Sequence, residues 1–215
     1  MIDLYAAPTP EGWKVSIALE ELGIPYVAHP IDACSDPRLA PDFLRIGPCG
    51  CVPAIIDHDA DDCAIFEAGA ILVYLSEKTG RLMPPDAAGR ALVMQWLLFN
   101  AAGAGRSSAP AQPGASGGVA DAGATRMQLR TLFSALDRQL QNRDYLAGAF
   151  SIADIAQWAW VRMHAWSDID MTGYQALARW LDRIALRDAC RRGLTVPQPF
   201  EPAEQVYRVK SILLR

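Results

Sequence analysis

Residues 52–79 read VPAIIDHDADDCAIFEAGAILVYLSEKT, and the interpretation of the first part of the chain depends on this stretch. Its first six residues, 52–57, are mostly apolar and are predicted to form a strand. Pro53 lies near the start of this strand, where a proline is tolerated. Residues 63–66 are a short partner strand, and the acidic residues between the two strands form a turn. From Glu67 to Thr79 apolar residues recur at helical spacing, and Gly80 stands where a glycine commonly ends a helix. The stretch therefore predicts a hairpin followed by a helix.

The residues before this stretch extend the same pattern. Residues 2–6 alternate as a short strand does, and residues 13–22 carry apolar side chains at helical spacing before Gly23. Residues 26–31 are a second strand candidate, and residues 37–45 favour a short irregular helix. The resulting order, β-α-β-α-β-β-α, predicts a small mixed sheet with helices packed against it.

Strand patterns nearly vanish after Gly80. Long helical patterns cover residues 87–100, 125–141, 152–166 and 174–186. Residues 101–124 are rich in Gly, Ala, Ser and Pro, which predicts a mobile loop or helix ends that fray. The division that we expect is an α+β domain, a linker, an all-helical domain and a tail, at residues 1–80, 81–87, 88–200 and 201–215.

Composition limits the classes of partner. The net charge of the 215 residues is -4, so no basic surface indicates nucleic-acid binding. No apolar run reaches the roughly 18 residues that a membrane helix needs. The N-terminus lacks the regions of a signal peptide. These features predict a cytoplasmic protein without a nucleic-acid or membrane partner.

Cysteine and histidine usage gives no sign of a metal centre. The five cysteines are an odd number, which argues against a disulfide framework. Their spacing does not match the two close pairs of ligands that a structural zinc site uses. The three histidines are scattered along the chain. The sequence therefore predicts that the protein has no metal site.

Three local patterns carry further information. Ser151 and Asp154 stand at capping-box spacing, with Phe150 and Ile155 at the staple positions, which predicts a helix start.

The second pattern is Val52-Pro53 at the start of a strand. A cis proline at Pro53 would leave the Val52 backbone open to an extended peptide, although a trans proline that merely starts a strand is more frequent.

The third pattern is Glu67-Ala68 at a helix start. The first amides of a helix attract an anion, and Glu67 has the charge to hold an ammonium group. A ligand that carries both groups is an amino acid. The alternative is a glutamate that simply favours its position at a helix N-terminus.

Four motifs in the right order carry a resemblance. They are Tyr5-Ala6-Ala7-Pro8-Thr9-Pro10, Val52-Pro53-Ala54-Ile55, Phe66-Glu67-Ala68-Gly69-Ala70-Ile71-Leu72 with Tyr74-Leu75, and Ser151-Ile152-Ala153-Asp154. The chain resembles the glutathione transferase superfamily, and most of all its branch of bacterial Nu-class and yeast prion-like disulfide-bond oxidoreductases. The resemblance covers nearly the whole chain.

The resemblance implies a fold and a set of roles. It implies a thioredoxin-like N-terminal domain, an all-α C-terminal domain, a cis bond at Pro53 and a homodimer with its active site between the domains. Glutathione would be the co-substrate. The Val52 backbone would hold its cysteinyl part, Glu67 and the Ala68 amide its γ-glutamyl end, and Thr9 would donate a hydrogen bond to the thiolate. The other substrate would be a small electrophile or a disulfide.

The chain departs from this branch at three positions. The branch usually has Asn where this chain has Glu11, and a carboxylate there raises the pKa of a nearby thiol. Cys51 replaces a Lys or Arg that would face the glycyl carboxylate, and Ala68 replaces a Ser that would bind the γ-glutamyl carboxylate. Two lost hydrogen bonds to charged groups weaken binding by about two to four decades.

The departures leave two interpretations of function open. The first is a glutathione transferase-like enzyme that conjugates glutathione to an electrophile or reduces a disulfide. The alternative is a repurposed enzyme or a ligand-binding protein of the same fold that does not depend on glutathione, with Glu11 as its acid–base group. Arg106 is a candidate contact for an acidic substrate in the cleft, although a solvated arginine is more common. Cys49 and Cys51 are a candidate redox pair, or two incidental thiols in a loop.

Overall fold

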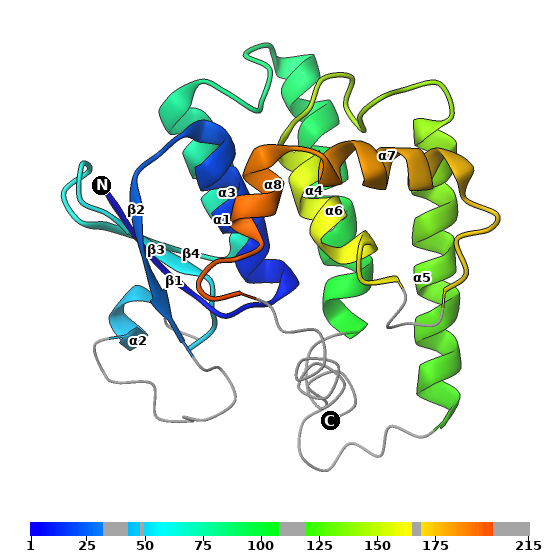
Figure 1. Cartoon of the computed structure of the whole chain (residues 1–215), viewed down its shortest axis with the longest axis horizontal. Coiled ribbons are helices and arrows are strands. Elements are labelled where there is room, and N and C mark those ends of the chain that lie inside the picture. Colours follow the sequence, from blue (N-terminus) through cyan, green and yellow to red (C-terminus); the bar gives the residue numbers. More distant parts are fainter. Residues whose placement is uncertain (32–42, 48–49, 108–118, 165–168, 200–215) are drawn as a thin grey trace. The chain divides into compact units, whose positions relative to one another are not determined.

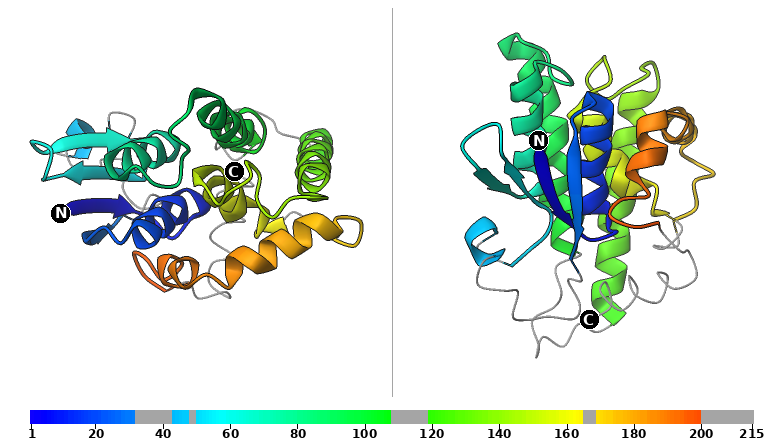
Figure 2. Two further views of the ribbon diagram at one scale, coloured as in Figure 1. Left: turned by 90° about the horizontal axis from the view of Figure 1, so that it is seen from above. Right: turned by 60° about the vertical axis from the view of Figure 1, so that its left-hand side comes forward.

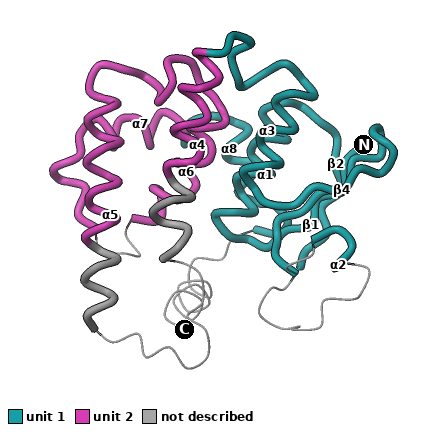
Figure 3. Tube along the Cα trace, turned by 180° about the vertical axis from the view of Figure 1, so that it is seen from behind, with its two compact units in different colours: residues 1–87, 185–200 teal, residues 88–184, 201–215 magenta. Residues whose placement is uncertain are grey.

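The computed structural model describes residues 1–31, 43–47, 50–107, 119–164 and 169–199. The chain divides into two compact units, drawn in different colours in Figure 3. Unit 1 comprises residues 1–87 and 185–200, and unit 2 comprises residues 88–184 and 201–215. Unit 1 contains the sheet expected of the thioredoxin-like domain, and unit 2 contains the helices expected of the all-helical domain.

Unit 1 contains a four-stranded sheet and its helices. Its elements are β1 (Ile2–Ala6), α1 (Pro10–Leu22), β2 (Tyr26–Pro30), α2 (Phe43–Ile46), β3 (Ala54–Asp57), β4 (Cys63–Phe66), α3 (Ala68–Thr79) and α8 (Asp188–Gly193). The strands lie in the order β2-β1-β3-β4. β1 pairs in parallel with β2, whereas β3 is antiparallel to both β1 and β4. This is the small mixed sheet that the sequence predicts, although residues 37–42 of the expected second helix lie outside the described residues.

α1 and α3 pack against each other along one side of the sheet (Figures 1 and 2). The alternation of β1 explains why the helices cover this side of the sheet, since Ile2, Leu4 and Ala6 are buried while the residues that alternate with them, Asp3 and Tyr5, are only half-buried. α1 ends at Gly23, whose φ of 68° is left-handed and favours glycine. The expected glycine stop of α1 is therefore confirmed.

The C-terminal helix of unit 1, α8, lies against α1. This segment falls within residues 88–200, which are expected to form the helical domain, and no helix is predicted there. A Cβ atom added at Gly193 would lie 2.7 Å from Ile17 Cγ1 and 2.8 Å from the Ile17 backbone. Glycine therefore allows the two helix backbones to approach, and ion pairs from Arg187 to Glu21 and from Arg192 to Glu20 flank this contact.

Unit 2 is helical throughout its described elements. These are α4 (Ala87–Ser107), α5 (Val119–Leu140), α6 (Ile152–Val161) and α7 (Gln175–Ala185). Of the two alternatives for residues 101–124, a loop is wrong at both ends of the range, because residues 101–107 continue α4 and residues 119–124 belong to α5. Alanine, the strongest helix former, outweighs glycine in these segments. Residues 108–118 lie outside the described part.

α6 is almost entirely buried within unit 2, since nine of its ten residues are buried. A helix that is apolar on all sides belongs inside a core. Gln157 of α6 donates a hydrogen bond to the Trp96 carbonyl of α4, and Trp158 Nε1 donates one to the Leu181 carbonyl of α7. These bonds join α6 to the helices on either side.

The predicted capping box at the start of α6 is present. Asp154 is fully buried and its carboxylate accepts four hydrogen bonds. Two come from Ser151, from its backbone N at 3.0 Å and from its Oγ at 3.1 Å. The other two come from the Leu146 backbone N at 2.9 Å and from Trp180 Nε1 at 3.0 Å. The box therefore also joins α6 to α7 and to the segment before it.

None of the helices in the described ranges is both long enough and apolar enough to span a bilayer.

Candidate functional site

The strand register brings three loops of unit 1 to one end of the sheet. Tyr5 pairs with Ala54 across β1 and β3, and Ala54 pairs with Phe66 across β3 and β4. The chain leaves β1 just after Tyr5, enters β3 at Ala54 and leaves β4 at Phe66. The loop before α1, the Val52-Pro53 segment and the start of α3 therefore meet at this edge, which we call the loop end of the sheet.

Thr9 caps α1 at the loop end. Its side-chain oxygen accepts a hydrogen bond from the Gly12 amide at 3.3 Å, and Pro10 follows at the first helical position. Because the Thr9 oxygen is the acceptor in this bond, the hydroxyl keeps its hydrogen for a second partner. A Cβ at Gly12 would lie 2.2 Å from the Ala7 carbonyl oxygen, so glycine is required for the loop to approach the helix.

Glu11 is not isolated, because it forms an ion pair with Lys14. The Lys14 ammonium lies 2.5 Å from Glu11 Oε1, and the Lys14 side chain is only 9% exposed. Burial lowers the pKa of Lys14 below its ordinary value, although the carboxylates of Glu11 and Glu67 act to raise it. Lys14 is not among the predicted site residues, although its i,i+3 spacing from Glu11 is a signal that indicates such a pair.

The Val52–Pro53 peptide bond is cis, as the resemblance implies. Pro53 is buried and Val52 is half-buried. Within the described residues, neither the amide nor the carbonyl of Val52 makes a backbone–backbone hydrogen bond. Cys51 is exposed beside them, whereas Cys49 lies outside the described residues.

Glu67 and Ala68 form the start of α3. Glu67 has a left-handed φ of 71° and an exposed side chain, and its carbonyl accepts the Ile71 amide at 3.0 Å. A glutamate in this conformation is strained, and such strain clusters at ligand-binding positions. Ala68 is buried. The first amides of α3 have no partner within the helix, which is a property of every helix N-terminus.

A buried carboxylate ties α3 to the sheet. Asp57 of β3 is fully buried and its Oδ2 lies 2.6 Å from the Tyr74 hydroxyl and 2.5 Å from the Lys78 ammonium of α3. Burial acts to raise the pKa of Asp57, but hydrogen bonds from Lys78, Tyr74 and the Asp59 amide outweigh it, so this pKa lies below its ordinary value. The network holds α3 on β3 and therefore fixes Glu67 relative to Val52, and nothing in the sequence analysis anticipates it.

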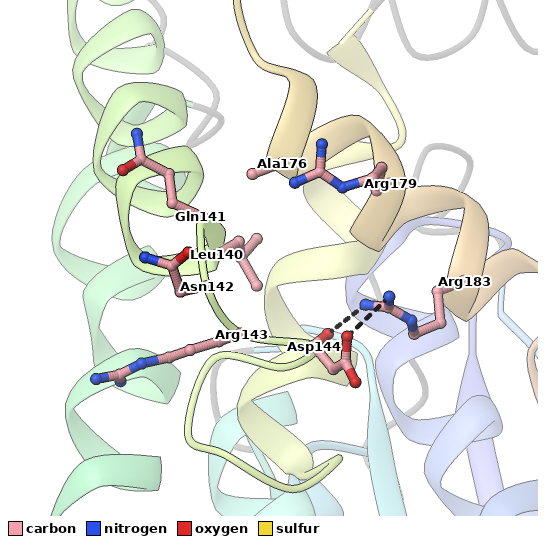
Figure 4. A pocket seen from close by; sticks show the side chains of 8 residues that line it. All are labelled: Leu140, Gln141, Asn142, Arg143, Asp144, Ala176, Arg179 and Arg183. Carbon is pink, nitrogen blue, oxygen red and sulfur yellow. Dashed lines mark hydrogen bonds and ion pairs between the residues drawn. The ribbon is translucent and has the colours of Figure 1, made fainter.

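Two hollows lie away from the loop end. One of about 250 Å³ lies in unit 2, where Arg179 and Arg183 of α7 face the segment after α5 (Figure 4). Arg183 forms an ion pair with Asp144 at 2.8 Å in this hollow. The other hollow lies beside β2 in unit 1 and includes Tyr26 and Arg192. Neither contains a residue that the sequence analysis assigns to the site.

Other predicted residues stay outside the site as the structure describes it. Arg106 lies in α4 where only the backbone is described, so its proposed contact with substrate stays a prediction. Among the described side chains, no group of three or more His, Cys, Asp or Glu is arranged to hold a metal ion.

Comparison with known proteins decides the family. Residues 10–78 match the N-terminal domain of glutathione S-transferase, and residues 109–188 match its C-terminal domain. The chain is 37% identical to the disulfide-bond oxidoreductase YfcG of Escherichia coli (strain K12), over 92% of this chain and 96% of that protein. The chain belongs to the glutathione S-transferase family. It is an enzyme of that family, and the predicted likeness to bacterial disulfide-bond oxidoreductases is confirmed.

Solved structures of glutathione transferases agree with this assignment. A transferase from Burkholderia graminis, with two glutathione molecules bound per subunit, is 34% identical, with a TM-score of 0.82 over 91% of this chain and 88% of that one. A transferase from Pseudomonas putida, with one glutathione disulfide bound per subunit, is also 34% identical. Its TM-score is 0.81 over 91% of each chain. The fold expected for a glutathione transferase is therefore confirmed.

Proposed function

We propose that this glutathione S-transferase binds glutathione at the loop end of the sheet and uses its thiolate to reduce small disulfides. The observation that carries the proposal is the register of β1, β3 and β4, because it brings Thr9, Val52 and Glu67 to the same edge. These residues offer a hydroxyl donor, an extended backbone and a carboxylate. Together they complement a thiol, a peptide backbone and an ammonium group, which are the parts of a γ-glutamyl tripeptide.

Each group has one role in the proposed complex. The Val52 backbone pairs with the cysteinyl residue as an added strand does. The Glu67 carboxylate holds the γ-glutamyl ammonium, while the first amides of α3, at Ala68 and after it, hold the γ-glutamyl carboxylate. Thr9 donates its hydroxyl hydrogen to the sulfur, and the N-terminus of α1 also favours the thiolate. Cys51 lies beside this site without a required role.

The proposed reaction is thiol–disulfide exchange. The bound thiolate attacks one sulfur of a disulfide, a new sulfur–sulfur bond forms, and the other sulfur leaves as a thiolate that takes up a proton. A second glutathione then attacks the glutathione sulfur of this mixed disulfide. Glutathione disulfide and the second substrate thiol leave, so two glutathione molecules are oxidised for each disulfide reduced. The Escherichia coli relative is a disulfide-bond oxidoreductase, and the Pseudomonas putida transferase has glutathione disulfide bound, which favours this reaction over conjugation.

The Glu67→Gln variant tests the binding mode. Losing a charge-assisted bond to the ammonium weakens glutathione binding by about 10-fold to 100-fold. Glu77→Gln changes an exposed glutamate further along α3 and is the matched control, which we expect to bind glutathione as the wild type does. Equal affinity in the Glu67 variant and the wild type contradicts the proposed binding mode.

A substrate panel separates the possible reactions. We expect turnover of a small disulfide with glutathione, measured by coupling glutathione disulfide formation to its reductase. Turnover of an aryl halide alone would assign conjugation instead. A glutathione-independent activity that Glu11→Gln abolishes and Thr9→Ala leaves intact would support the repurposed enzyme.

We also infer a homodimer that works in the cytoplasm. The dimer follows from the resemblance to a family whose members are homodimers. Within the described residues, the exposed Cys63 is in no disulfide, as is usual in a reducing compartment. Analytical ultracentrifugation tests the dimer, and a monomer at micromolar concentration contradicts it.

A further inference from the structure

Lys14 is a buried cation beside the proposed site. It lies in the second turn of α1, and its side chain is 9% exposed. Lysine is almost never buried unless it is paired, and here the ammonium lies 2.5 Å from Glu11 Oε1. The aliphatic part of the Lys14 side chain is buried within unit 1, and its ammonium group pairs with the Glu11 carboxylate in the preceding turn.

The position of Glu11 explains why this pairing matters for chemistry. Glu11 stands in the first turn of α1, two residues after the Thr9 cap. A carboxylate at this place repels a negative sulfur held by Thr9 and opposes loss of the thiol proton. The ammonium of Lys14 contributes the opposite charge at hydrogen-bond distance, so the pair adds no net charge near the sulfur.

We propose that Lys14 is a positioning residue of the glutathione site, which holds and neutralises the Glu11 carboxylate so that negative charge can form on the glutathione sulfur next to Thr9. This inference rests on the proposed glutathione-dependent function. It explains how the chain accommodates a carboxylate at the position of Glu11 without losing the thiolate. Lys14 acts through Glu11 and does not itself touch the substrate.

The charged groups around α1 are consistent with this role. On α1 itself Lys14 meets Glu11, and from the start of α3 the carboxylate of Glu67 also acts on it. The arginines of α8 and the segment before it engage other residues of α1, in the pairs Arg187–Glu21 and Arg192–Glu20. Lys78 of α3 is paired with Asp57. Lys14 forms the ion pair with Glu11.

Four variants of the full-length chain test the inference: Lys14→Met, Lys14→Arg, Glu11→Gln and the double variant Lys14→Met with Glu11→Gln. The measurement is the pKa of the bound glutathione thiol, obtained from the ultraviolet absorbance of the thiolate as pH is varied at saturating glutathione. Methionine matches the lysine stem but lacks its charge, and arginine keeps the charge.

We expect Lys14→Met to raise the pKa of the bound thiol by about one unit or more, because Glu11 is then uncompensated. Lys14→Arg keeps the wild-type value. Glu11→Gln gives a value at or below that of the wild type. In the double variant the pKa returns to within a few tenths of a unit of the wild type, since both charges are gone.

A purely structural Lys14 gives a different pattern. Lys14→Met would then lower the melting temperature and leave the thiol pKa unchanged, which overturns the inference. If Lys14→Met does not fold, a raised thiol pKa in Glu11→Gln or in the double variant overturns it equally. Failure of the wild-type chain to bind glutathione would overturn the proposed function as well, so the two failures are distinguishable.

Discussion

Ser16 Oγ donates a 2.7 Å hydrogen bond to the Gly193 carbonyl oxygen. Both residues are buried, and they lie 177 positions apart in the sequence. The bond lies where α8 packs on α1. α1 carries Thr9 at its cap, Glu11 in its first turn and Lys14 in its second. A segment from near the C-terminus therefore supports the helix on which half of the proposed site is built.

Gly193→Ala tests how closely these two helices approach. The new methyl group would meet the Ile17 backbone at 2.8 Å, which cannot move aside as a flexible side-chain end can. We expect a loss of about 1–3 kcal/mol in the free energy of unfolding, measured by urea denaturation. Gly173→Ala is the control, because an added Cβ there meets nothing within 4 Å. Equal stability of the two variants contradicts the close packing.

Asp154→Ala tests the core of unit 2. The substitution leaves the Ser151 and Leu146 amides and Trp180 Nε1 buried without their acceptor. We expect a loss of about 3–5 kcal/mol, more than a helix cap alone contributes. The measurement is the midpoint of thermal and chemical unfolding.

Asp137→Ala is the matched control for Asp154. Its carboxylate is half-buried and accepts one hydrogen bond, from the Leu177 amide at 2.9 Å. We expect a loss of about 1 kcal/mol for this single bond. A smaller effect at Asp154 than at Asp137 would show that the four-bond network does not stabilise unit 2.

Asp57 makes stability depend on pH. Its pKa in the folded chain is lower than the ordinary value of 3.8, so its ionised form stabilises the fold above that value. As pH falls through the folded pKa the contribution is lost. We expect Asp57→Asn to be clearly less stable than the wild type at neutral pH and the difference to narrow steadily below about pH 4.

Tyr74→Phe provides the control for this pH effect. It removes one donor to Asp57 and leaves the Lys78 ion pair in place. Its stability difference from the wild type should also narrow on acidification, but from a smaller starting value. A difference between Asp57→Asn and wild type that stays constant from pH 7 to pH 3 would exclude Asp57 as the titrating group.

Thr9→Val tests the proposed donor to sulfur. Valine keeps the shape and lacks the hydroxyl, so we expect the rate constant for disulfide reduction to fall by about 10²-fold to 10³-fold, as when one donor to a developing anion is lost. Loss of the cap also costs about 1 kcal/mol of stability. Thr9→Ser keeps the hydroxyl and should retain most of the activity. Full activity in Thr9→Val with a loss in Thr9→Ser would instead assign the effect to the methyl group and contradict the proposed donor.

The sequence predicts most of the fold because its signals are local. The alternation of residues 2–6, the glycine after α1 and the Ser151–Asp154 box each act within a few residues, and each is present in the structure. Residues 101–107 and 119–124 are helical, but their many small residues give no clear helical periodicity of apolar side chains in the sequence. α8 has only six residues, too few for a periodic pattern to stand out.

The candidate site is less accessible to sequence reasoning because its supports are long-range. Thr9, Val52 and Glu67 are recognisable from motifs, but their meeting depends on the register of three strands. The Asp57 network joins residues 17 and 21 positions apart. Lys14 could be found by its spacing from Glu11, yet its burial arises only from tertiary packing.

The most direct test of the account is calorimetric titration of the wild-type chain with glutathione and with the dipeptide Cys-Gly, which lacks the γ-glutamyl residue. If the loop end of the sheet holds the tripeptide by its backbone at Val52 and by its amino end at Glu67, glutathione binds and the dipeptide binds at least about 100-fold more weakly. Equal affinity for the two peptides, or no heat from either at millimolar concentration, would contradict the account.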